Sequence, residues 1–556
     1  MLPVQYCYLK QLTGLAMRQG FQQVINHIYP WQDLAEGHLN VNLPIELFKT
    51  KKNKYIFDYN NVSFLRVNDV AYDVLSNARY RVHTFGRSSR KYSHKTINDV
   101  YSDLETIQES GLLVSKEFKR GYVADVDEIK DILDNRIEGI TISITSQCNL
   151  GCSYCLYGGK YSNYSEPDSQ AMSWEVLKSS LDFLHNHSKE SKTVRIDFFG
   201  GEPLLAFRLI KQSVSYCKKL KEQTDTEVVI TIASNGTVLS KSIIDFIVQE
   251  KIYIQFSIDG EKDIHDKFRK FKANGKGSHD LIMRNLEKIF RKNSDYYSKY
   301  VRLKGVVTPN ALDDFDQEFF GNELIANIVK ANHFAFVPLQ PNFDLINDEA
   351  YMEGLRKLGR KLANLKNIQT IEEIRDQLNI KEQALYDMVF VDFFDSQLLN
   401  LTKFTNSDVV PFTKSCQVGF TDAVVMPDGN IYVCILANKG SDYNIGNVIK
   451  GEWDYKKISC LKDKLYESWS QCDTCFVQKF CDLCYEKING CCGEWDSSRM
   501  KFCHFNRYRY RMVFSDMLQL MDNNPNLWSN FQEKAQKLVM EELKKQNSDH
   551  GIADKF

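Results

Sequence analysis

The sequence predicts an α/β protein with a central parallel sheet, a smaller module before the sheet and a Cys-rich domain after it. Between residues 138 and 340, six apolar runs typical of strands alternate with segments of helical periodicity. Such alternation indicates parallel strands joined by crossover helices. Three cysteines follow the first of these strands, and ten of the fifteen cysteines lie in residues 416–503. A chain of 556 residues is also long for one domain, so two or three domains are expected.

The composition is that of a globular protein without a strongly charged partner. Hydrophobic residues make up 43% of the chain and charged residues 26%, and the formal net charge is −1. This balance gives no electrostatic reason to expect nucleic-acid or membrane binding. The first residues, MLPVQYCYLKQL, lack a signal-peptide pattern, and no apolar run approaches the length of a membrane span. Clustered cysteines then favour metal binding in a reducing cytoplasm over disulfides.

Residues 1–130 are expected to form an N-terminal module. The first forty residues have a helical pattern and carry no identifiable chemistry. Two strands, two helices and an extended stretch are predicted after them, at 55–60, 63–68, 69–78, 96–113 and 121–126. Strands, helices and a small wing suggest a winged-helix module. The segment resembles the leader-peptide recognition element at the front of many peptide-modifying enzymes, and this resemblance implies that a leader adds as a further strand. A packing appendage without a binding role is the alternative.

Residues 138–340 are expected to hold the parallel sheet. Its strands are predicted at 139–146, 194–199, 227–234, 252–259, 300–307 and 333–339. In barrel-like βα folds the loops at the C-terminal ends of the strands carry the active site. Functional residues are therefore expected where these strands end.

Three cysteines follow the first predicted strand: Cys148, Cys152 and Cys155, hereafter the cysteine trio. Their spacing is C-x3-C-x2-C, and Tyr154 directly precedes the third cysteine. Three thiolates can hold three corners of a [4Fe-4S] cluster and leave the fourth iron without a protein ligand. A structural zinc site or unrelated buried thiols are the alternatives.

A second motif, Gly200-Gly201-Glu202-Pro203, follows the predicted strand at 194–199. Glycines let the backbone approach a neighbour closely, and the Glu202 carboxylate can neutralise an ammonium group. By itself the motif is also consistent with a turn before a helix. With the cysteine trio, in this order and at strand ends, it resembles the radical SAM superfamily.

This resemblance implies a partial (β/α)6 barrel that binds a [4Fe-4S] cluster through the cysteine trio. S-adenosylmethionine (SAM) would chelate the open iron, and one electron from the cluster would release a 5′-deoxyadenosyl radical. The turn at 200–203 would meet the amino group of SAM. Ser234 and Asn235 would hydrogen-bond its ribose or carboxylate, and Tyr154 would contact its adenine.

Two further segments match the superfamily by their order along the barrel. The fourth strand ends in Ser257-Ile258-Asp259-Gly260, and the segment HDKFR follows. The resemblance implies that Ser257 and Arg269 contact SAM, with the Arg269 fork on its carboxylate. Asp259 is either part of this pocket or a structural cap for the next segment.

The second cysteine cluster lies in a domain predicted at 411–510. Its pattern is C-x12-G-x4-C, then C-x2-C-x5-C-x2-C, then one more cysteine. This pattern resembles the SPASM extension of radical SAM enzymes and implies two auxiliary [4Fe-4S] clusters. One cluster would be held by Cys472, Cys475, Cys481 and Cys503. The other would be held by Cys416, Cys434 and Cys484.

The second of these ligand sets departs from the family pattern. The family usually has three residues, not two, before Cys484, and no cysteine lies between 417 and 433. The fourth ligand position of this cluster is therefore either open or filled by Cys491, Cys492 or a substrate thiol. The hairpin VVMPDGNIYVC is expected to place Cys434 on a strand after an Asp-Gly turn. Zinc is the alternative for the C-x2-C-x5-C-x2-C set.

The remaining segments are expected to be helical. Residues 341–410 would form a bridge, and residues 511–556 a C-terminal tail. The aromatic and basic stretch RYRYRMVF is interpreted as a helix that packs on the core, in preference to a nucleic-acid site.

Together the resemblances imply a maturase of ribosomally synthesised peptides. Such an enzyme takes a hydrogen atom from a precursor peptide and forms a thioether or carbon–carbon crosslink. The stretches CSYCLYGGKY and FFGGEPLL are most similar to thioether-forming maturases of Cys-rich peptides. The implied partners are the precursor peptide, with its leader on the N-terminal module, and a ferredoxin or flavodoxin as electron donor.

Two other functions remain open. An anaerobic sulfatase-maturing enzyme would oxidise Cys or Ser to formylglycine, and there an Asp commonly follows the hairpin cysteine as the base. Here Ile435 follows Cys434, which counts against this reading. A non-catalytic peptide-binding metal scaffold is the alternative of another class, and the intact cysteine trio, GGEP turn and Arg269 argue against it.

Overall fold

The computed structural model describes residues 43–533 with internal gaps. The gaps are 62, 80–90, 115–118, 121–125, 156–170, 222–225, 308–318, 320, 331–333, 339–347, 380–381, 384–385, 387–408, 411–422, 436–442, 471, 473, 482, 484, 486–496, 528 and 532. The helical pattern predicted for the first forty residues and most of the predicted C-terminal tail lie outside the described residues.

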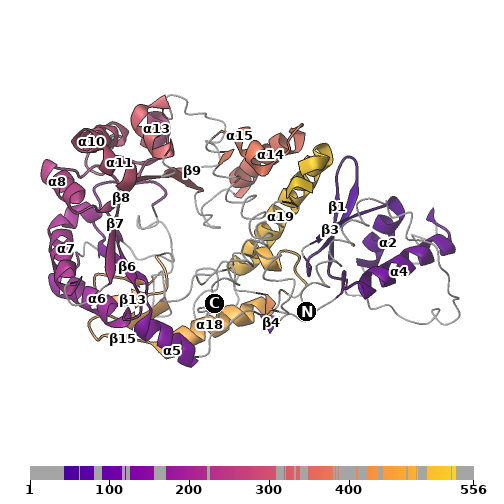
Figure 1. The fold of residues 1–556 in the computed structure, drawn as a ribbon, viewed down its shortest axis with the longest axis horizontal. Coiled ribbons are helices and arrows are strands. Elements are labelled where there is room, and N and C mark those ends of the chain that lie inside the picture. Colours follow the sequence, from indigo (N-terminus) through magenta and orange to yellow (C-terminus); the bar gives the residue numbers. More distant parts are fainter. Residues whose placement is uncertain are drawn as a thin grey trace.

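A ten-stranded mixed sheet is the centre of the described structure (Figure 1). Its strands run in the order β10-β9-β8-β7-β6-β5-β12-β13-β14-β15, and β5 to β10 are mutually parallel. The parallel strands are β5 (Gly139–Thr145), β6 (Thr193–Gly200), β7 (Glu227–Ser234), β8 (Tyr253–Ser257), β9 (Val301–Val307) and β10 (Phe334–Pro338). The six strands predicted between 138 and 340 are confirmed, each to within two residues at either end.

Helices cover one face of the parallel strands, because alternate side chains of each strand point to that face. In β6, Val194, Ile196 and Phe198 are buried against the helices, whereas Arg195 on the opposite face is exposed. Figure 1 shows α6, α7, α8 and α10 along the outer side of the curved sheet. The elements of this layer are α5 (Val126–Asn135), α6 (Trp174–His187), η2 (Pro203–Ala206), α7 (Phe207–Lys221), α8 (Lys241–Gln249), α9 (Lys262–Phe268), α10 (His279–Lys292), α11 (Ser294–Tyr300) and α13 (Glu323–Lys330).

A hairpin from the C-terminal third of the chain extends the sheet beside β5. Strand β12 (Val424–Val425) pairs in parallel with β5 and antiparallel with β13 (Asn430–Tyr432). The predicted Asp-Gly turn is confirmed, since Gly429 has a φ of +84° and Asp428 Oδ1 accepts from the Asn430 N–H at 3.0 Å. β13 ends two residues before Cys434, and this cysteine forms a single β-bridge just beyond the strand. Strands β14 (Asn444–Asn447) and β15 (Glu452–Trp453) complete the sheet.

The N-terminal module is a three-stranded antiparallel sheet with two helices. Its elements are β1 (Ile45–Lys49), β2 (Lys54–Asp58), β3 (Ser63–Val67), α2 (Asp69–Arg79) and α4 (His94–Glu109). Strand β1 was not predicted. The extended stretch predicted at 121–126 is wrong at its end, where Val126 begins α5; residues 121–125 lie outside the described part. A short parallel pair joins β4 (Lys119–Arg120) to β11 (Val409–Val410).

The N-terminal module packs on α19 (Ser497–Asn523), the long helix in the middle of Figure 1. Phe48 and Phe57 lie 5.7 and 5.1 Å from Phe514, measured between ring centroids. Near the end of α19, Asp522 Oδ1 accepts from Asn53 at 2.6 Å. The interpretation of RYRYRMVF as a core-packing helix is confirmed, because Tyr510, Val513 and Phe514 are buried. The other helices near α19 are α14 (Asp348–Asn364), α15 (Ile371–Asp376), α18 (Tyr455–Ser470) and η6 (Gln478–Phe480).

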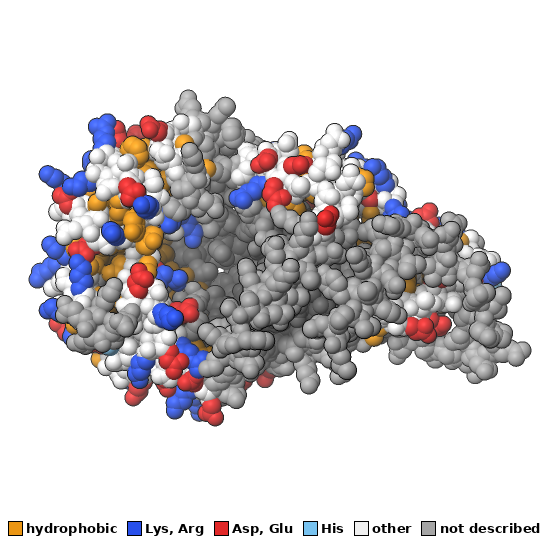
Figure 2. Space-filling view, viewed as in Figure 1, with side chains coloured by type: hydrophobic (Ala, Val, Ile, Leu, Met, Phe, Trp, Pro, Cys, Tyr) orange, Lys and Arg blue, Asp and Glu red, His pale blue; other side chains and the backbone are white. Residues whose placement is uncertain are grey.

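The surface carries charges of both signs. Figure 2 shows Lys and Arg side chains interspersed with Asp and Glu over the helices around the parallel strands. Within the described residues, none of the helices combines the length and the apolar character that crossing a membrane requires.

Candidate active site

The cysteine trio lies in the loop that begins at the C-terminal end of β5, and its thiols are partly exposed. A backbone ladder fixes the loop against residues 268–272. The N–H of Gly151 donates to the Lys270 carbonyl at 2.8 Å, and the N–H of Ser153 donates to the Phe268 carbonyl at 3.1 Å. The loop is therefore held from the side of α9, and its cysteines lie at a strand end as predicted.

The GGEP turn holds the same loop from the side of β6. Gly201 N–H donates to the Thr145 carbonyl at 2.7 Å, and Glu202 N–H donates to the Gln147 carbonyl at 2.8 Å. A Cβ atom on Gly201 would overlap the Gln147 carbonyl. Gly200 has a φ of +124°, which an L side chain rarely adopts. The two motifs found in the sequence thus form one unit, and the glycines permit the contact.

Glu202 is fully buried and fastens the turn to the end of β7. Its carboxylate accepts from the N–H of Asn235 at 2.7 Å, the Ser234 hydroxyl at 2.9 Å and the N–H of Leu204 at 3.0 Å. Burial raises the pKa of Glu202 to about 7, although these three hydrogen bonds oppose the shift. The side chains of Glu202 and Ser234 therefore hold the site together from within.

Asn235 connects the end of β7 to the cysteine loop. Its Nδ2 donates to Asn149 Oδ1 at 2.9 Å and lies 3.6 Å from the Cys148 sulfur. Thr237 donates to Asn235 Oδ1 through its N–H at 3.0 Å and through its hydroxyl at 2.6 Å, so the orientation of the amide is fixed. Asn149 is a supporting residue that sequence reasoning did not identify, because an isolated polar residue in a loop carries no distinct signal.

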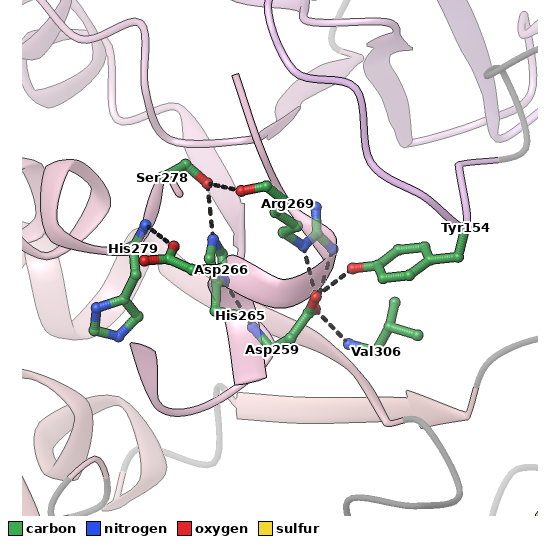
Figure 3. Close-up of polar contacts among 8 residues, drawn as sticks. All are labelled: Tyr154, Asp259, His265, Asp266, Arg269, Ser278, His279 and Val306. Atoms are coloured by element: carbon green, nitrogen blue, oxygen red, sulfur yellow. Dashed lines mark hydrogen bonds and ion pairs between the residues drawn. The ribbon is translucent and has the colours of Figure 1, made fainter. Parts of the chain in front are cut away.

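Asp259 and Arg269 form a buried ion pair (Figure 3). Arg269 Nε donates to Asp259 Oδ2 at 2.8 Å, and Arg269 Nη2 donates to Oδ1 at 3.1 Å. The hydroxyl of Tyr154 and the N–H of Val306 also donate to this carboxylate. Burial alone would raise the pKa of Asp259, but the charge and hydrogen bonds of Arg269 outweigh it and lower that pKa. Asp259 therefore joins the cysteine loop, α9 and β9.

His265 is an uncharged side chain that connects the backbone of Asp259 to Ser278. Burial lowers the pKa of His265 to about 3, so the imidazole is uncharged near neutral pH. Its Nδ1 accepts from the Asp259 N–H at 3.2 Å, which leaves Nε2 as the donor to the Ser278 hydroxyl at 2.9 Å. Ser278 in turn donates to the Arg269 carbonyl at 3.1 Å. His265 lies within the HDKFR segment, so sequence could have suggested it, whereas nothing in the sequence marked Ser278.

Arg269 also contacts the cysteine loop. Its guanidinium carbon lies 5.4 Å from the Tyr154 ring centroid. Burial raises the pKa of Cys152 to about 12, and the positive charge of Arg269 opposes that rise. Asp259 takes two of the five Arg269 N–H groups, which leaves three for another acceptor. Ser257, at the end of β8, is partly exposed, unlike Ser234 and the Asp259–Arg269 pair.

Four cysteines gather around α19, and they are hereafter the C-terminal cysteine set: Cys472, Cys475, Cys481 and Cys503. Cys475 N–H donates to the Cys472 carbonyl at 2.9 Å, which makes a tight turn. From α19, Asn506 Nδ2 lies 3.5 Å from the Cys481 sulfur. Burial alone would lower the pKa of Arg507, but the charge of Cys475, a hydrogen bond to it and the charges of Cys503 and Cys472 raise that pKa.

A buried donor near the C-terminal cysteine set has no acceptor. Gln478 lies between Cys475 and Cys481 and is buried, and its Nε2 has no hydrogen-bond partner among the described residues. Leaving such a group unpaired costs about 1–3 kcal/mol. The sulfurs of an iron–sulfur cluster accept N–H donors such as that of Asn506, so the residues present fit such a group. In the part of the chain that the structure describes, no three His, Cys, Asp or Glu side chains form a site for a single metal ion.

The other predicted ligands are only partly described. Cys434 follows β13 and packs against the core of the parallel sheet. Cys416 and Cys484 lie outside the described residues, as do both alternative ligands, Cys491 and Cys492.

Comparisons with known proteins identify the family. The Radical SAM superfamily pattern matches residues 142–310, which contain the cysteine trio, the GGEP turn and the Asp259–Arg269 pair. The chain is 27% identical over 297 residues to a cysteine-type anaerobic sulfatase-maturating enzyme of Clostridium novyi, covering 52% of this chain and 71% of that enzyme. It is 30% identical over 233 residues to an uncharacterized protein of Methanocaldococcus jannaschii, covering 41% and 74% of the two chains.

Among solved structures, native anSMEcpe with bound AdoMet and the Cp18Cys peptide matches with a TM-score of 0.46 at 20% identity. The match covers 69% of this chain and 98% of that one. With the family pattern spanning β5 to β9 and its motifs assembled at one edge of the sheet, the chain belongs to the radical SAM superfamily and is a radical SAM enzyme.

Proposed function

We propose that this radical SAM enzyme modifies a ribosomally synthesised precursor peptide and forms a thioether or carbon–carbon crosslink in it. The cysteine trio would hold a [4Fe-4S] cluster, which together with SAM would supply a 5′-deoxyadenosyl radical. When a thioether forms, the peptide would lose one hydrogen atom to that radical. As its cysteine sulfur bonds to the carbon, it would then lose one proton to a base or to solvent and one electron to an auxiliary cluster. The modified peptide is therefore lighter by two hydrogens.

The residues around the cysteine trio support SAM binding in specific roles. The backbone of the GGEP turn would receive the amino group of SAM, because Glu202 is occupied by three protein donors. The three remaining N–H groups of Arg269 would hold the SAM carboxylate. Ser257 and Tyr154, both partly exposed, would contact the ribose and the adenine. Ser234 and Asn235 would act indirectly, by fixing Glu202 and the cysteine loop.

The observation that carries the peptide proposal is the N-terminal module itself. Its sheet order is β1-β2-β3, so among the described residues β1 and β3 each have one strand neighbour. Strand β1 contacts α19, whereas α2 follows directly on β3. An extended leader peptide can pair with such an edge through backbone hydrogen bonds. We therefore assign the module to leader binding, with β3 as the pairing strand.

Auxiliary clusters complete the proposal. The C-terminal cysteine set would hold one [4Fe-4S] cluster, and Cys434 with Cys416 and Cys484 would hold another. Because β12 pairs with β5, the hairpin before Cys434 is built into the sheet that carries the cysteine trio. A ferredoxin or flavodoxin would supply the electron that starts each cycle.

A formylglycine-forming sulfatase maturase is the second candidate. The similarity to the sulfatase-maturating enzyme of Clostridium novyi favours it. Against it stands Ile435, whose side chain cannot accept a proton at the position where a base is expected.

The two candidates give different products. The reconstituted enzyme would be incubated anaerobically with SAM, a reductant and one of two probes: a sulfatase peptide with the target Cys, or a short Cys-rich peptide encoded beside the gene. We expect the neighbouring peptide to lose two hydrogens and the sulfatase peptide to stay unchanged. If instead the sulfatase peptide exchanges its sulfur for an aldehyde oxygen, the enzyme is a sulfatase maturase.

The role of the N-terminal module has its own test. A proline at Leu65, in the middle of β3, disrupts the strand that a paired leader would join. We expect Leu65→Pro to abolish modification of the neighbouring peptide and to leave SAM cleavage without peptide at the wild-type rate. Unchanged modification would contradict leader pairing at β3, and loss of both activities would point to a folding defect.

A further inference from the structure

Side-chain donors on α19 face the sulfurs of the C-terminal cysteine set. Cys503, Asn506 and Arg507 are spaced i, i+3 and i+4, so they share one face of the helix. Asn506 is 1% exposed, and its Nδ2 lies 3.5 Å from the Cys481 sulfur. Arg507, on the exposed side, places its positive charge near Cys475, Cys503 and Cys472. One buried amide donor and one guanidinium charge of α19 therefore lie beside the C-terminal cysteine set.

The orientation of the Asn506 amide is fixed by a neighbour on the same helix. Arg509 Nη2 donates to Asn506 Oδ1 at 2.6 Å. Because the guanidinium group can only donate, it selects the amide oxygen and leaves the amide N–H groups for Cys481. The donor near this sulfur is thus set by the fold and does not depend on a free rotation of the side chain.

Donors of this kind change the energy of electron addition to an iron–sulfur cluster. The reduced cluster carries one more negative charge, and N–H···S hydrogen bonds and nearby cations stabilise that charge. The effect is larger for a buried donor such as Asn506, because the surroundings screen charge weakly. Removing either donor should therefore make reduction harder.

We propose that Asn506 and Arg507 raise the one-electron reduction potential of a [4Fe-4S] cluster on the C-terminal cysteine set. This inference rests on the cluster assignment made under the proposed function. In consequence, this cluster takes an electron more readily than a cluster on the same four thiolates would without the two donors.

The test is a redox titration of the full-length chain followed by electron paramagnetic resonance. To isolate one cluster, the cysteine trio, Cys416 and Cys434 are replaced by Ala, and the protein is reconstituted anaerobically. Asn506→Leu and Arg507→Gln are then compared with Asn523→Leu, a matched control on the same helix. Asn523 donates to the Ala363 carbonyl at 2.8 Å and lies away from the cysteines.

We expect about four irons per chain in every variant, as one [4Fe-4S] cluster requires. At a fixed potential, Asn506→Leu should lower the ratio of reduced to oxidised cluster about tenfold, a shift of about 59 mV for one electron. Arg507→Gln should shift the potential in the same direction, and the control should not shift it. Iron retained with an unchanged potential in both variants would overturn the inference and leave the proposed function standing. Zinc in place of iron in the parent protein would overturn the cluster assignment first.

Discussion

Asp259 connects three segments of the site through the hydrogen bonds that its carboxylate accepts. Its carboxylate receives hydrogen bonds from the Arg269 guanidinium, the Tyr154 hydroxyl and the Val306 N–H, which belong to three different segments. The sequence alone left Asp259 between a pocket role and a structural one. The structure favours the structural role, since the carboxylate is buried and has four protein donors.

Asp259→Asn should strongly destabilise the protein. The substitution leaves Arg269 as a buried charge without its partner, and breaking such a pair costs about 3–5 kcal/mol. Urea unfolding followed by circular dichroism at pH 7 measures the change. Asp295→Asn is the control: it breaks an exposed ion pair with Lys299 and should change stability by at most about 1 kcal/mol. Equal unfolding midpoints for the two variants would contradict the anchoring role.

Gly201→Ala should weaken the cysteine loop without unfolding the sheet. A Cβ at this position would overlap the Gln147 carbonyl, so the turn and the loop must separate. We expect the variant to lose iron from the cysteine trio while its far-ultraviolet circular dichroism is retained. Gly321→Ala is the matched control, because no atom of the described residues lies within 4 Å of the position of its Cβ. If both variants bind iron equally, the close approach is not needed for the site.

Sequence identified the positions of the site better than the roles of its side chains. The cysteine trio, the GGEP turn and Arg269 come together as expected. Glu202 and Ser234, expected at SAM, are bonded to each other and to neighbouring backbone, and sequence did not predict these bonds. A motif shows which residue types meet at a strand end, but the hydrogen bonds that they satisfy within the protein depend on packing that the motif does not contain.

At the scale of elements, the strands of the parallel sheet were predictable because each is a continuous apolar run between polar loops. Strand β1 was missed, because one five-residue run gives a weak signal beside an uninformative segment. The pairing of β12 with β5 could also not be predicted from the sequence. It joins two residues of a short strand to a partner in a distant part of the chain, and sequence pattern does not specify such a register.

The α14–α19 contact contains a carboxyl group that should make stability depend on pH. Asp516 of α19 lies where Gly359 of α14 has no Cβ. Burial raises the pKa of Asp516 to about 6, partly opposed by Arg360. The folded state therefore holds this proton between pH 4 and 6 when the unfolded chain does not, so stability falls as pH rises through that range.

Asp516→Asn should remove this pH dependence. The variant should be more stable than the wild type by about 1–3 kcal/mol at pH 7, and by much less at pH 4.5. Urea unfolding at the two pH values measures both differences. The same difference at both values would show that the carboxyl group does not titrate between them.

At the scale of the whole molecule, the N-terminal module and the C-terminal cysteine set share one aromatic core. Phe57 packs on Phe64, Phe480 and Phe514, and Phe476 and Phe480 lie between Cys475 and Cys481. The module is therefore attached to the cysteine-bearing end of the protein. The sequence suggested the existence of the module but not its partner, because the contact joins opposite ends of the chain.

Phe57→Ala should destabilise this shared core. The side chain is fully buried, and truncating a buried Phe costs about 3–5 kcal/mol. Chemical denaturation should show the loss, together with weaker iron retention by the C-terminal cysteine set. Leu205→Ala, at a position 46% exposed, should have little effect on either quantity. Loss of stability with iron retention unchanged would mean that the module and the cysteine set are independent.

The measurement that tests the central claim most directly is iron and sulfide per chain, with 5′-deoxyadenosine formed from SAM, in wild type and in a variant with the cysteine trio replaced by Ala. We predict about twelve irons in wild type and about eight in the variant, which should form no 5′-deoxyadenosine. A variant that keeps its iron and still cleaves SAM would contradict the assignment of the trio. About four irons with bound zinc in wild type would contradict the auxiliary clusters.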